Sequence, residues 1–311
     1  MKPIKILDGG MSRELVRLGA NLRQPEWSAL ALMEAPEVVR RVHEEFIVAG
    51  ADVITTNSYA LVPFHIGEER FRAEGRRLIA LAGRLARAAA DSAKERKVLV
   101  AGSLPPIFGS YEPQLFRPER AQDYLGVLVE ELTPYVDLWL GETLSLVAEA
   151  EAVRQAVAST GKPFWISFTL DDGPGTEPNP AALRSGELLD DAARWVAGSG
   201  AQALLFNCSR PEVMQAAVEE ASEVLDTLGV SLNIGVYANA FASDEEGAAN
   251  ETLHSVRDDL SADRYSRFAC GWVKSGASII GGCCGVGASH IRCVASRLNR
   301  RENDSYSRLA E

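Results

Sequence analysis

The sequence predicts an α/β protein folded as a single (β/α)8 TIM barrel, and three observations support this fold class. Short apolar runs alternate with longer amphipathic patterns eight times along the chain. Strands that alternate with helices form a parallel sheet, and eight such units in 311 residues match the size of a closed barrel. An open doubly wound sheet is the alternative, but Asp8-Gly9-Gly10 after the first strand is too short for a dinucleotide-binding loop.

The strands are predicted from apolar, often β-branched runs that end in polar or glycine residues. They are expected at residues 4–7, 52–56, 97–101, 136–141, 163–170, 201–206, 230–237 and 278–280. The helices are predicted from apolar residues three and four positions apart. They are expected at residues 36–49, 70–92, 118–133, 144–159, 186–197, 211–228, 261–274 and 287–298.

Local signals support individual elements and their ends. The first of these helices has Val38, Val42 and Phe46 on one face, and Gly50 follows its last residue. His43 lies within the same pattern and is expected at the surface. Pro211 suits the first turn of the helix that it begins.

One domain is predicted over residues 1–298, followed by a polar C-terminal tail at residues 299–311. Two long loops, at residues 171–185 and 238–260, follow predicted strands. In a barrel both loops would lie at the carboxyl ends of the strands, where binding loops and lids are found.

Composition narrows the possible partners. The chain has 43 acidic and 32 basic residues and a net charge of −11, which disfavours nucleic acid and anionic membranes. No apolar run reaches the ~18–20 residues of a membrane-spanning helix, and the first residues lack the apolar region of a signal peptide. We therefore expect a cytoplasmic protein with small-molecule substrates, and its oligomeric state stays open.

The cysteines are the strongest chemical signal. There are five, and in a reducing compartment metal or thiol chemistry is expected in place of a disulfide framework. Cys283 and Cys284 lie between glycines directly after the last strand, and Cys208 directly follows another strand. Three thiolates at the carboxyl end of a barrel suit Zn²⁺ with one coordination position open. Cys208 by itself fits a buried core position equally well, and the neighbouring pair favours the ligand role.

The two other cysteines, Cys270 and Cys293, lie inside helical patterns. A position within a helix does not reach the end of a strand, so both are expected to be core residues.

Two carboxylates also follow predicted strands. Asp8 precedes Gly9 and Gly10 after the first strand, and Glu142 follows the fourth. Carboxylates can hold an ammonium group while backbone N–H groups take a carboxylate, which is a pattern for amino-acid recognition. Helix or turn capping is the structural alternative for both residues.

Taken together, these motifs resemble the homocysteine S-methyltransferase family, over residues 6–298. The most specific match is Gly281-Gly282-Cys283-Cys284-Gly285 together with the upstream Asn207-Cys208, and Leu7-Asp8-Gly9-Gly10 and Glu142-Thr143 are matches that are weak singly. Weaker matches are Thr55-Thr56, Ser58-Tyr59, Ala101-Gly102-Ser103 and Ser167-Phe168-Thr169.

The resemblance implies a (β/α)8 barrel with Zn²⁺ held by Cys208, Cys283 and Cys284. It further implies that Asp8 and Glu142 bind the ammonium group of homocysteine. The substrate-binding set is completed by the amides of Gly9 and Gly10 for the carboxylate, by Tyr59 near the open metal position, and by Asn207.

The implied reaction moves a methyl group from a sulfonium donor, S-methylmethionine or S-adenosylmethionine, to the thiolate of homocysteine and gives methionine. Aromatic residues near predicted strand ends would suit a cationic donor. They are Trp27, Tyr59, Tyr111, Phe168, Tyr237 and Phe241.

The sequence departs most from the family pattern in two loops where the methyl donor would bind. The loops after the third and seventh strands read Ser103-Leu104-Pro105-Pro106-Ile107 and Ala238-Asn239-Ala240-Phe241, unlike many relatives. The alternatives are a betaine-type or other methylated donor, and a non-catalytic zinc or thiol sensor on a barrel scaffold.

Overall fold

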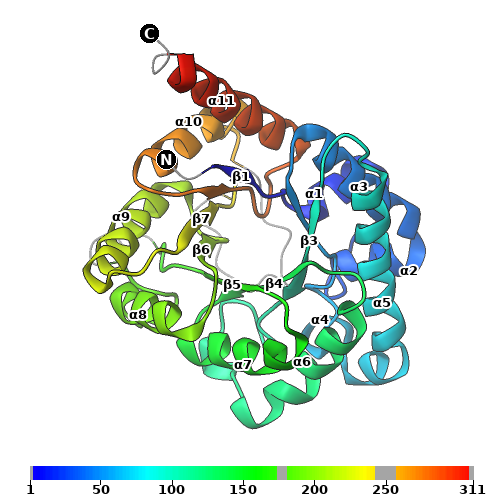
Figure 1. Ribbon diagram of the computed structural model, residues 1–311. Helices are drawn as coiled ribbons and strands as arrows, with labels where there is room; N and C mark the ends of the chain where they lie inside the picture. The colour runs from blue at the N-terminus through cyan, green and yellow to red at the C-terminus, as the bar shows by residue number, and fades with distance from the viewer. Residues whose placement is uncertain (1–2, 174–180, 242–256, 308–311) are drawn as a thin grey trace.

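The computed structural model describes residues 3–173, 181–241 and 257–307, with side chains described as far as Asn299. Eight parallel strands form one barrel with helices around it, which Figure 1 shows from the amino ends of the strands. The strands are β1 (Lys5–Ile6), β2 (Val53–Thr55), β3 (Leu99–Leu104), β4 (Leu138–Leu144), β5 (Phe164–Phe168), β6 (Ala203–Asn207), β7 (Asn233–Tyr237) and β8 (Ile279–Ile280).

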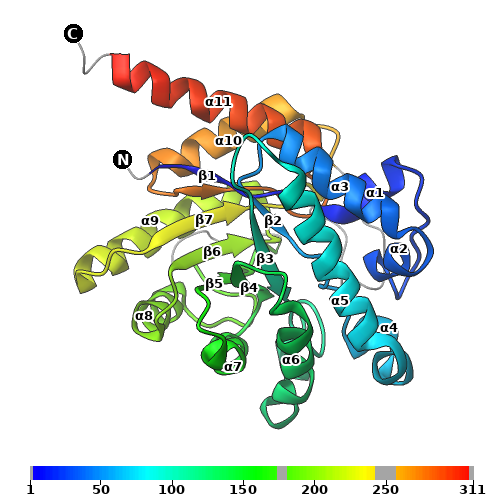
Figure 2. The ribbon, with the colours of Figure 1, turned by 45° about the vertical axis from the view of Figure 1, so that its right-hand side comes forward.

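The helices cover the outer face of the barrel (Figure 2). They are α1 (Met11–Arg17), α2 (Ser28–Glu34), α3 (Pro36–Ala49), α4 (Pro63–Ile66), α5 (Glu68–Ser92), α6 (Pro118–Leu132), α7 (Val147–Val157), α8 (Leu189–Ser199), α9 (Pro211–Leu228), α10 (Ala262–Lys274) and α11 (Ala288–Ser307). Two 3-10 turns, η1 (Pro113–Leu115) and η2 (Ala158–Thr160), lie between them. The predicted barrel and its eight strand–helix units are confirmed.

Backbone hydrogen bonds close the barrel at β1. This strand pairs with β8, where Lys5 lies opposite Ile279, and a bridge from Leu7 to Val53 joins it to β2. The remaining strands pair in sequence order. Because all the strands are parallel, their carboxyl ends and the residues that follow them meet at one end of the barrel.

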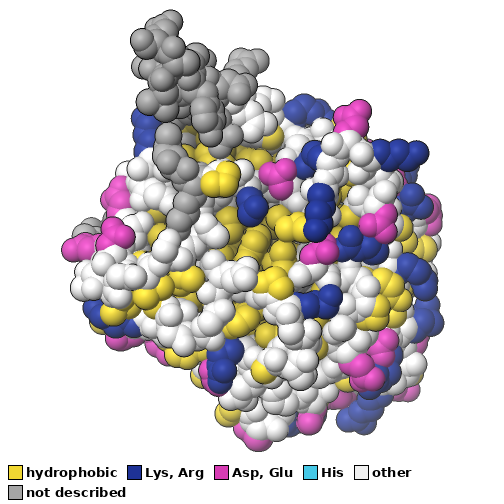
Figure 3. Space-filling model, in the orientation of Figure 1, with side chains coloured by type: hydrophobic (Ala, Val, Ile, Leu, Met, Phe, Trp, Pro, Cys, Tyr) yellow, Lys and Arg dark blue, Asp and Glu magenta, His cyan; other side chains and the backbone are white. Residues whose placement is uncertain are grey.

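The apolar residues form two layers. Inside the barrel, Leu140, Trp165, Leu205 and Ile279 belong to one buried cluster. A larger cluster fills the space between strands and helices. Figure 3 shows the face seen in Figure 1, with hydrophobic side chains gathered near its middle and many charged side chains toward its edge. The barrel interior is therefore a packed core, as alternating inward-facing residues require.

The boundary between β4 and α7 differs from the prediction. The helix expected from residue 144 begins at Val147, because Leu144 still pairs as a strand residue with Phe168. The strand register shifts between Gly141 and Leu144, which is typical of a bulge. Glu142 therefore lies within an irregular part of a strand. The short helices α1, α2 and α4 were not predicted.

The predicted tail was also partly wrong. Helix α11 continues past residue 298 to Ser307, because no glycine or proline follows Leu298 to end it. Residues 308–311 lie outside the described part of the chain. The same is true of residues 174–180 and 242–256, which make up much of the two predicted long loops.

Across the residues that the structure describes, no helix is both long enough and apolar enough to span a bilayer.

His43 was expected at the surface and is instead fully buried in α3. Neither of its ring nitrogens has a hydrogen-bond partner within the described residues. Burial without a partner disfavours the charged imidazolium, and it lowers the pKa of His43 from 6.5 to about 4. The helical pattern placed His43 beside Val42 and Phe46, on the boundary of the apolar face, and only tertiary packing covers it.

We predict that His43 makes the protein less stable in mild acid. Between pH 6.5 and pH 4 the unfolded chain binds a proton at His43 that the folded chain excludes, so the free energy of unfolding falls as the pH falls. The full shift is worth about 3 kcal/mol. Urea unfolding of the unaltered protein and of His43→Leu at pH 7 and pH 4.5 should show a smaller pH-dependent loss in the variant. Equal losses would contradict this account.

Candidate functional site

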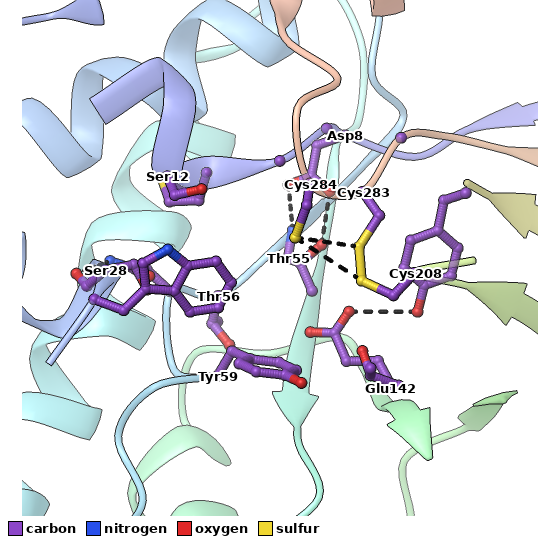
Figure 4. A pocket seen from close by; sticks show the side chains of 18 of the residues that line it. Asp8, Ser12, Ser28, Thr55, Thr56, Tyr59, Glu142, Cys208, Cys283 and Cys284 are labelled. Carbon is purple, nitrogen blue, oxygen red and sulfur yellow. Dashed lines mark hydrogen bonds between the residues drawn. A yellow bond between two sulfur atoms is a disulfide. The ribbon is translucent and has the colours of Figure 1, made fainter. Parts of the chain in front are cut away.

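Three cysteine sulfurs meet at the carboxyl end of the barrel (Figure 4). Cys208 follows β6, and Cys283 and Cys284 follow β8. The Sγ atom of Cys284 lies 3.9 Å from that of Cys208 and 4.0 Å from that of Cys283. All three sulfurs lie within 4.8 Å of one another, so together they can hold a metal ion. The structure thus brings together the three cysteines that the sequence singled out.

Cys208 and Cys283 are joined by a disulfide, whereas Cys284 is a free thiol. The expectation that the cysteines carry no disulfide is therefore wrong for this state of the protein. The two residues are 75 positions apart in sequence, and the barrel brings their Cα atoms to 5.7 Å, a separation usual for a disulfide. The same proximity allows the reduced sulfurs to share a metal ion.

The two remaining cysteines lie away from this cluster. Cys270 is buried in α10, and Cys293 in α11 directs its Sγ toward Ser266 Oγ at 3.4 Å. Both lie in helices, and the predicted core position is confirmed for Cys270, whereas Cys293 is only partly buried.

Glycines allow the turn after β8 to pack closely on the turn after β1. A Cβ atom at Gly10 would overlap the carbonyl oxygen of Cys283, and one at Gly282 would overlap the side chain of Val286. The N–H of Gly10 donates to Val286 O at 2.9 Å. This N–H is therefore already used within the protein, and its contact with a substrate carboxylate stays a prediction. The N–H of Gly9 makes no hydrogen bond within the described residues and stays available.

Asp8 projects from the end of β1 into the pocket and is 3% exposed. Its carboxyl group accepts a hydrogen bond from Thr55 N at 2.7 Å and one from Thr55 Oγ1 at 2.6 Å. Burial raises the pKa of Asp8 to about 7, against the lowering effect of these bonds, and the nearby charge of Glu142 raises it further. Asp8 is thus held by β2 and not used as a helix cap.

Glu142 lies across the pocket, on the irregular part of β4. Ser103 Oγ donates to its Oε1 atom, and the hydroxyl of Tyr237 donates to Oε2 at 3.3 Å. Burial raises the pKa of Glu142 to about 7. None of the described residues that line the pocket is Lys or Arg. Two carboxyl groups in such a place favour a cationic ligand, because an ammonium group would stabilise their ionised forms.

Aromatic rings form another part of the pocket wall. Of the six aromatic residues in the prediction, Trp27, Tyr59, Tyr111 and Tyr237 line the pocket, whereas Phe168 lies in the hydrophobic core and Phe241 does not line it. The rings of Trp27 and Tyr59 meet edge to face, with centroids 5.9 Å apart. The guanidinium carbon of Arg184 lies 4.4 Å from the ring centre of Tyr111 and already covers one face of that ring.

Tyr59 lines the same pocket as the two acidic residues and the cysteines, and Figure 4 shows it near Glu142. Its hydroxyl makes a 2.7 Å hydrogen bond with Ser110 Oγ, and burial raises its pKa above the ordinary value, so it is neutral at pH 7. Asn207, in contrast, is fully buried and does not line the pocket. Its side chain lies behind the residues that line the pocket, and its predicted contact with the substrate stays untested.

Three residues hold the carboxyl groups: Thr55 holds Asp8, and Ser103 and Tyr237 hold Glu142. The sequence assigns Thr55 and Ser103 no role of their own, and it predicts Tyr237 only as an aromatic ring for the donor. Thr55 and Ser103 occur in the motifs that resemble the family, and Tyr237 ends an apolar run. Their position at strand ends was visible in the sequence, but their partners were not.

The fold and the site together define a class of protein: a (β/α)8 barrel whose pocket brings three cysteines that could hold a metal ion next to two buried carboxyl groups. Residues 5–298 match the family model described as homocysteine S-methyltransferase. The chain belongs to the homocysteine S-methyltransferase family.

Known proteins of this family are similar to the chain over almost its whole length. Homocysteine S-methyltransferase of Escherichia coli (strain K12) is 31% identical over 311 residues, which cover 94% of this chain and 95% of that protein. The crystal structure of the E. coli homocysteine methyltransferase MmuM in its metallated form has a TM-score of 0.76 and 29% identity, and covers 95% of this chain and 96% of that one. Its oxidised form has a TM-score of 0.75 and 30% identity, with coverage of 94% and 96%.

Proposed function

We propose that this enzyme methylates homocysteine with a sulfonium donor and that its metal is Zn²⁺, held by Cys208, Cys283 and Cys284. S-methylmethionine is the first candidate donor and S-adenosylmethionine the second. The observation that supports the proposal is the convergence of three cysteine sulfurs beside two buried carboxyl groups. A metal that needs reduced thiolates also suits a reducing compartment, so the cytoplasm is the expected location.

The spacing of the sulfurs fits the metal. Zinc–sulfur bonds of ~2.3 Å in a tetrahedron place neighbouring sulfurs ~3.8 Å apart. The distances of 3.9 and 4.0 Å from Cys284 to its two neighbours are close to this value, and the disulfide must be reduced before the third sulfur can bind. Zn²⁺ bound there would supply the positive charge that favours the thiolate form of the substrate at neutral pH.

The pocket can orient homocysteine by its amino-acid end. The carboxylates of Asp8 and Glu142 would accept hydrogen bonds from the ammonium group, and the N–H of Gly9 would donate to the carboxylate. Thr55, Ser103 and Tyr237 hold the two acidic side chains in place. The substrate thiol is then directed toward the three cysteines.

The methyl transfer needs no further base. The thiol proton of homocysteine leaves to solvent, and the sulfur lone pair forms a bond to the methyl carbon of the donor. The bond from that carbon to the donor sulfur breaks, its electron pair stays on the donor, and a neutral thioether leaves. The enzyme contributes alignment of the two reactants, which is worth a large part of the barrier in such reactions. Methionine is the product.

The pocket wall suits a positively charged donor. Trp27 and Tyr59 present aromatic rings, and the acidic side chains add negative charge. A quaternary ammonium donor of the betaine type would gain from the same rings, and it is the second candidate donor class.

The cysteines should divide into two groups when they are replaced. Cys208→Ser, Cys283→Ser and Cys284→Ser should each lose most bound zinc and most activity, because two thiolates hold the ion poorly. Cys270→Ser is the matched control, since it removes a buried cysteine outside the cluster, and it should keep both. Zinc is counted per chain in protein purified under reducing conditions. Full zinc occupancy in a Cys283→Ser, Cys284→Ser double variant would exclude this metal site.

Replacement of the acidic residues should weaken substrate binding and leave the metal in place. Glu142→Gln and Asp8→Asn each remove a charge-assisted hydrogen bond, worth ~1.5–3 kcal/mol, so the KM for homocysteine should rise about tenfold to a hundredfold. In the unaltered enzyme KM should also rise as the pH falls below about 7, because both carboxyl groups then become protonated. Unchanged KM values in both variants would assign the two residues a structural role.

The proposed reaction is tested directly with a panel of donors. Reduced, zinc-loaded protein is mixed with homocysteine and with S-methylmethionine, S-adenosylmethionine or betaine, and methionine is measured by mass. We expect the fastest formation with S-methylmethionine. Activity with betaine alone would move the donor to the quaternary ammonium class. Zinc binding without methyl transfer from any donor would support the sensor alternative.

A further inference from the structure

The amide side chain of Asn207 connects the cysteine cluster with the acidic side of the pocket. Asn207 is the last residue of β6, directly before Cys208, and its side chain is completely buried. It lies behind the residues that line the pocket. A buried amide in this position must find partners for two donors and two acceptors.

Both donors and both acceptor sites of the Asn207 amide have partners. The Oδ1 atom accepts hydrogen bonds from Thr143 N at 2.9 Å and from Ser167 Oγ at 2.7 Å. The Nδ2 atom donates to Thr143 Oγ1 at 2.8 Å and to Cys283 Sγ at 3.9 Å. A backbone N–H can only donate, so the bond from Thr143 N fixes which end of the amide is oxygen. An N–H of Asn207 therefore points at a sulfur of the cluster.

The same amide holds a backbone conformation that Thr143 would not adopt freely. Thr143 has a φ of +61°, in the left-handed region, where a β-branched residue is an outlier. Both its N–H and its Oγ1 are bound by Asn207. Thr143 directly follows Glu142 in the irregular part of β4, so Asn207 holds the backbone next to Glu142. Asn207 is therefore hydrogen-bonded both to Cys283, a cysteine of the proposed metal site, and to Thr143, the residue that follows Glu142.

We propose that Asn207 is a positioning residue with two linked roles: its Nδ2–H donates to the Cys283 thiolate, and its other bonds orient Glu142 through Thr143. The inference rests on the proposed function for the identity of the metal. Three thiolates around a divalent cation carry a net negative charge, and an N–H donor stabilises that charge in a buried place.

One substitution separates this role from simple packing. Asn207→Asp keeps the size of the side chain and the acceptor for Thr143 N, and it replaces the donor beside Cys283 by an oxygen. Ser167→Ala is the matched control, because it removes a buried bond to the same amide on the side away from the sulfur. A packing role would make the two variants alike in metal binding.

The test measures zinc binding and not only catalysis. Reduced protein is loaded with zinc alone, its affinity is determined by competition with a chelator at pH 7, and the pH of half-release is recorded. We expect Asn207→Asp to bind zinc about tenfold to a hundredfold more weakly and to release it at higher pH. Its KM for homocysteine should rise as well, while Ser167→Ala stays within about twofold of the unaltered protein.

Affinity and release pH in Asn207→Asp equal to those of Ser167→Ala would overturn the proposal, even if both variants melt at a lower temperature. The outcome is independent of the reaction itself. If zinc affinity falls as expected and no donor methylates homocysteine, the positioning role holds and the proposed function fails.

A second measurement needs no variant and covers the case in which Asn207→Asp does not fold. In reduced protein loaded with ¹¹³Cd²⁺, a hydrogen bond to a metal-bound thiolate transmits a scalar coupling between the metal and the donated proton. A proton–cadmium correlation spectrum should contain a side-chain amide proton of Asn207. Correlations from cysteine protons without any from that amide would overturn the inference.

Discussion

The closure of the barrel at β1 is the constraint on which the site depends. The pairing of β1 with β8 and the bridge from Leu7 to Val53 set Asp8 beside Thr55 on one side and the turn with Cys283 on the other. Each of these contacts is made by backbone atoms or by a residue directly after a strand. The parallel register therefore carries the geometry of the site, and the residues that follow the strands supply the cysteines and the glycines.

Close backbone approach is the second requirement. The turns after β1 and β8 touch at Gly10 and Cys283, where no side chain larger than hydrogen fits. This contact holds Cys283 and Cys284 against the end of β1, next to Asp8 (Figure 4). The cysteine cluster and a buried carboxyl group thus share one support, which suits the proposed reaction, in which the substrate must reach both at once.

The positions of the three cysteine sulfurs are compatible with a disulfide and with a metal site. In the disulfide state Cys208 and Cys283 are bonded to each other, and in the reduced state three sulfurs remain close enough for one metal ion. MmuM of E. coli has been solved in both metallated and oxidised forms, and this chain superposes on each to a similar degree.

The sequence by itself determined the barrel, the three cysteines and the two acidic residues, because each follows from a local pattern: alternating strands and helices, and polar residues directly after apolar runs. Only the tertiary structure decided the burial of His43, the use of the Gly10 N–H by Val286, and the place of Asn207 behind the pocket. Asn207 and its partners Thr143 and Cys283 are 64 and 76 positions apart in sequence. Burial and hydrogen-bond partners of this kind arise between distant segments, so no pattern along the chain specifies them.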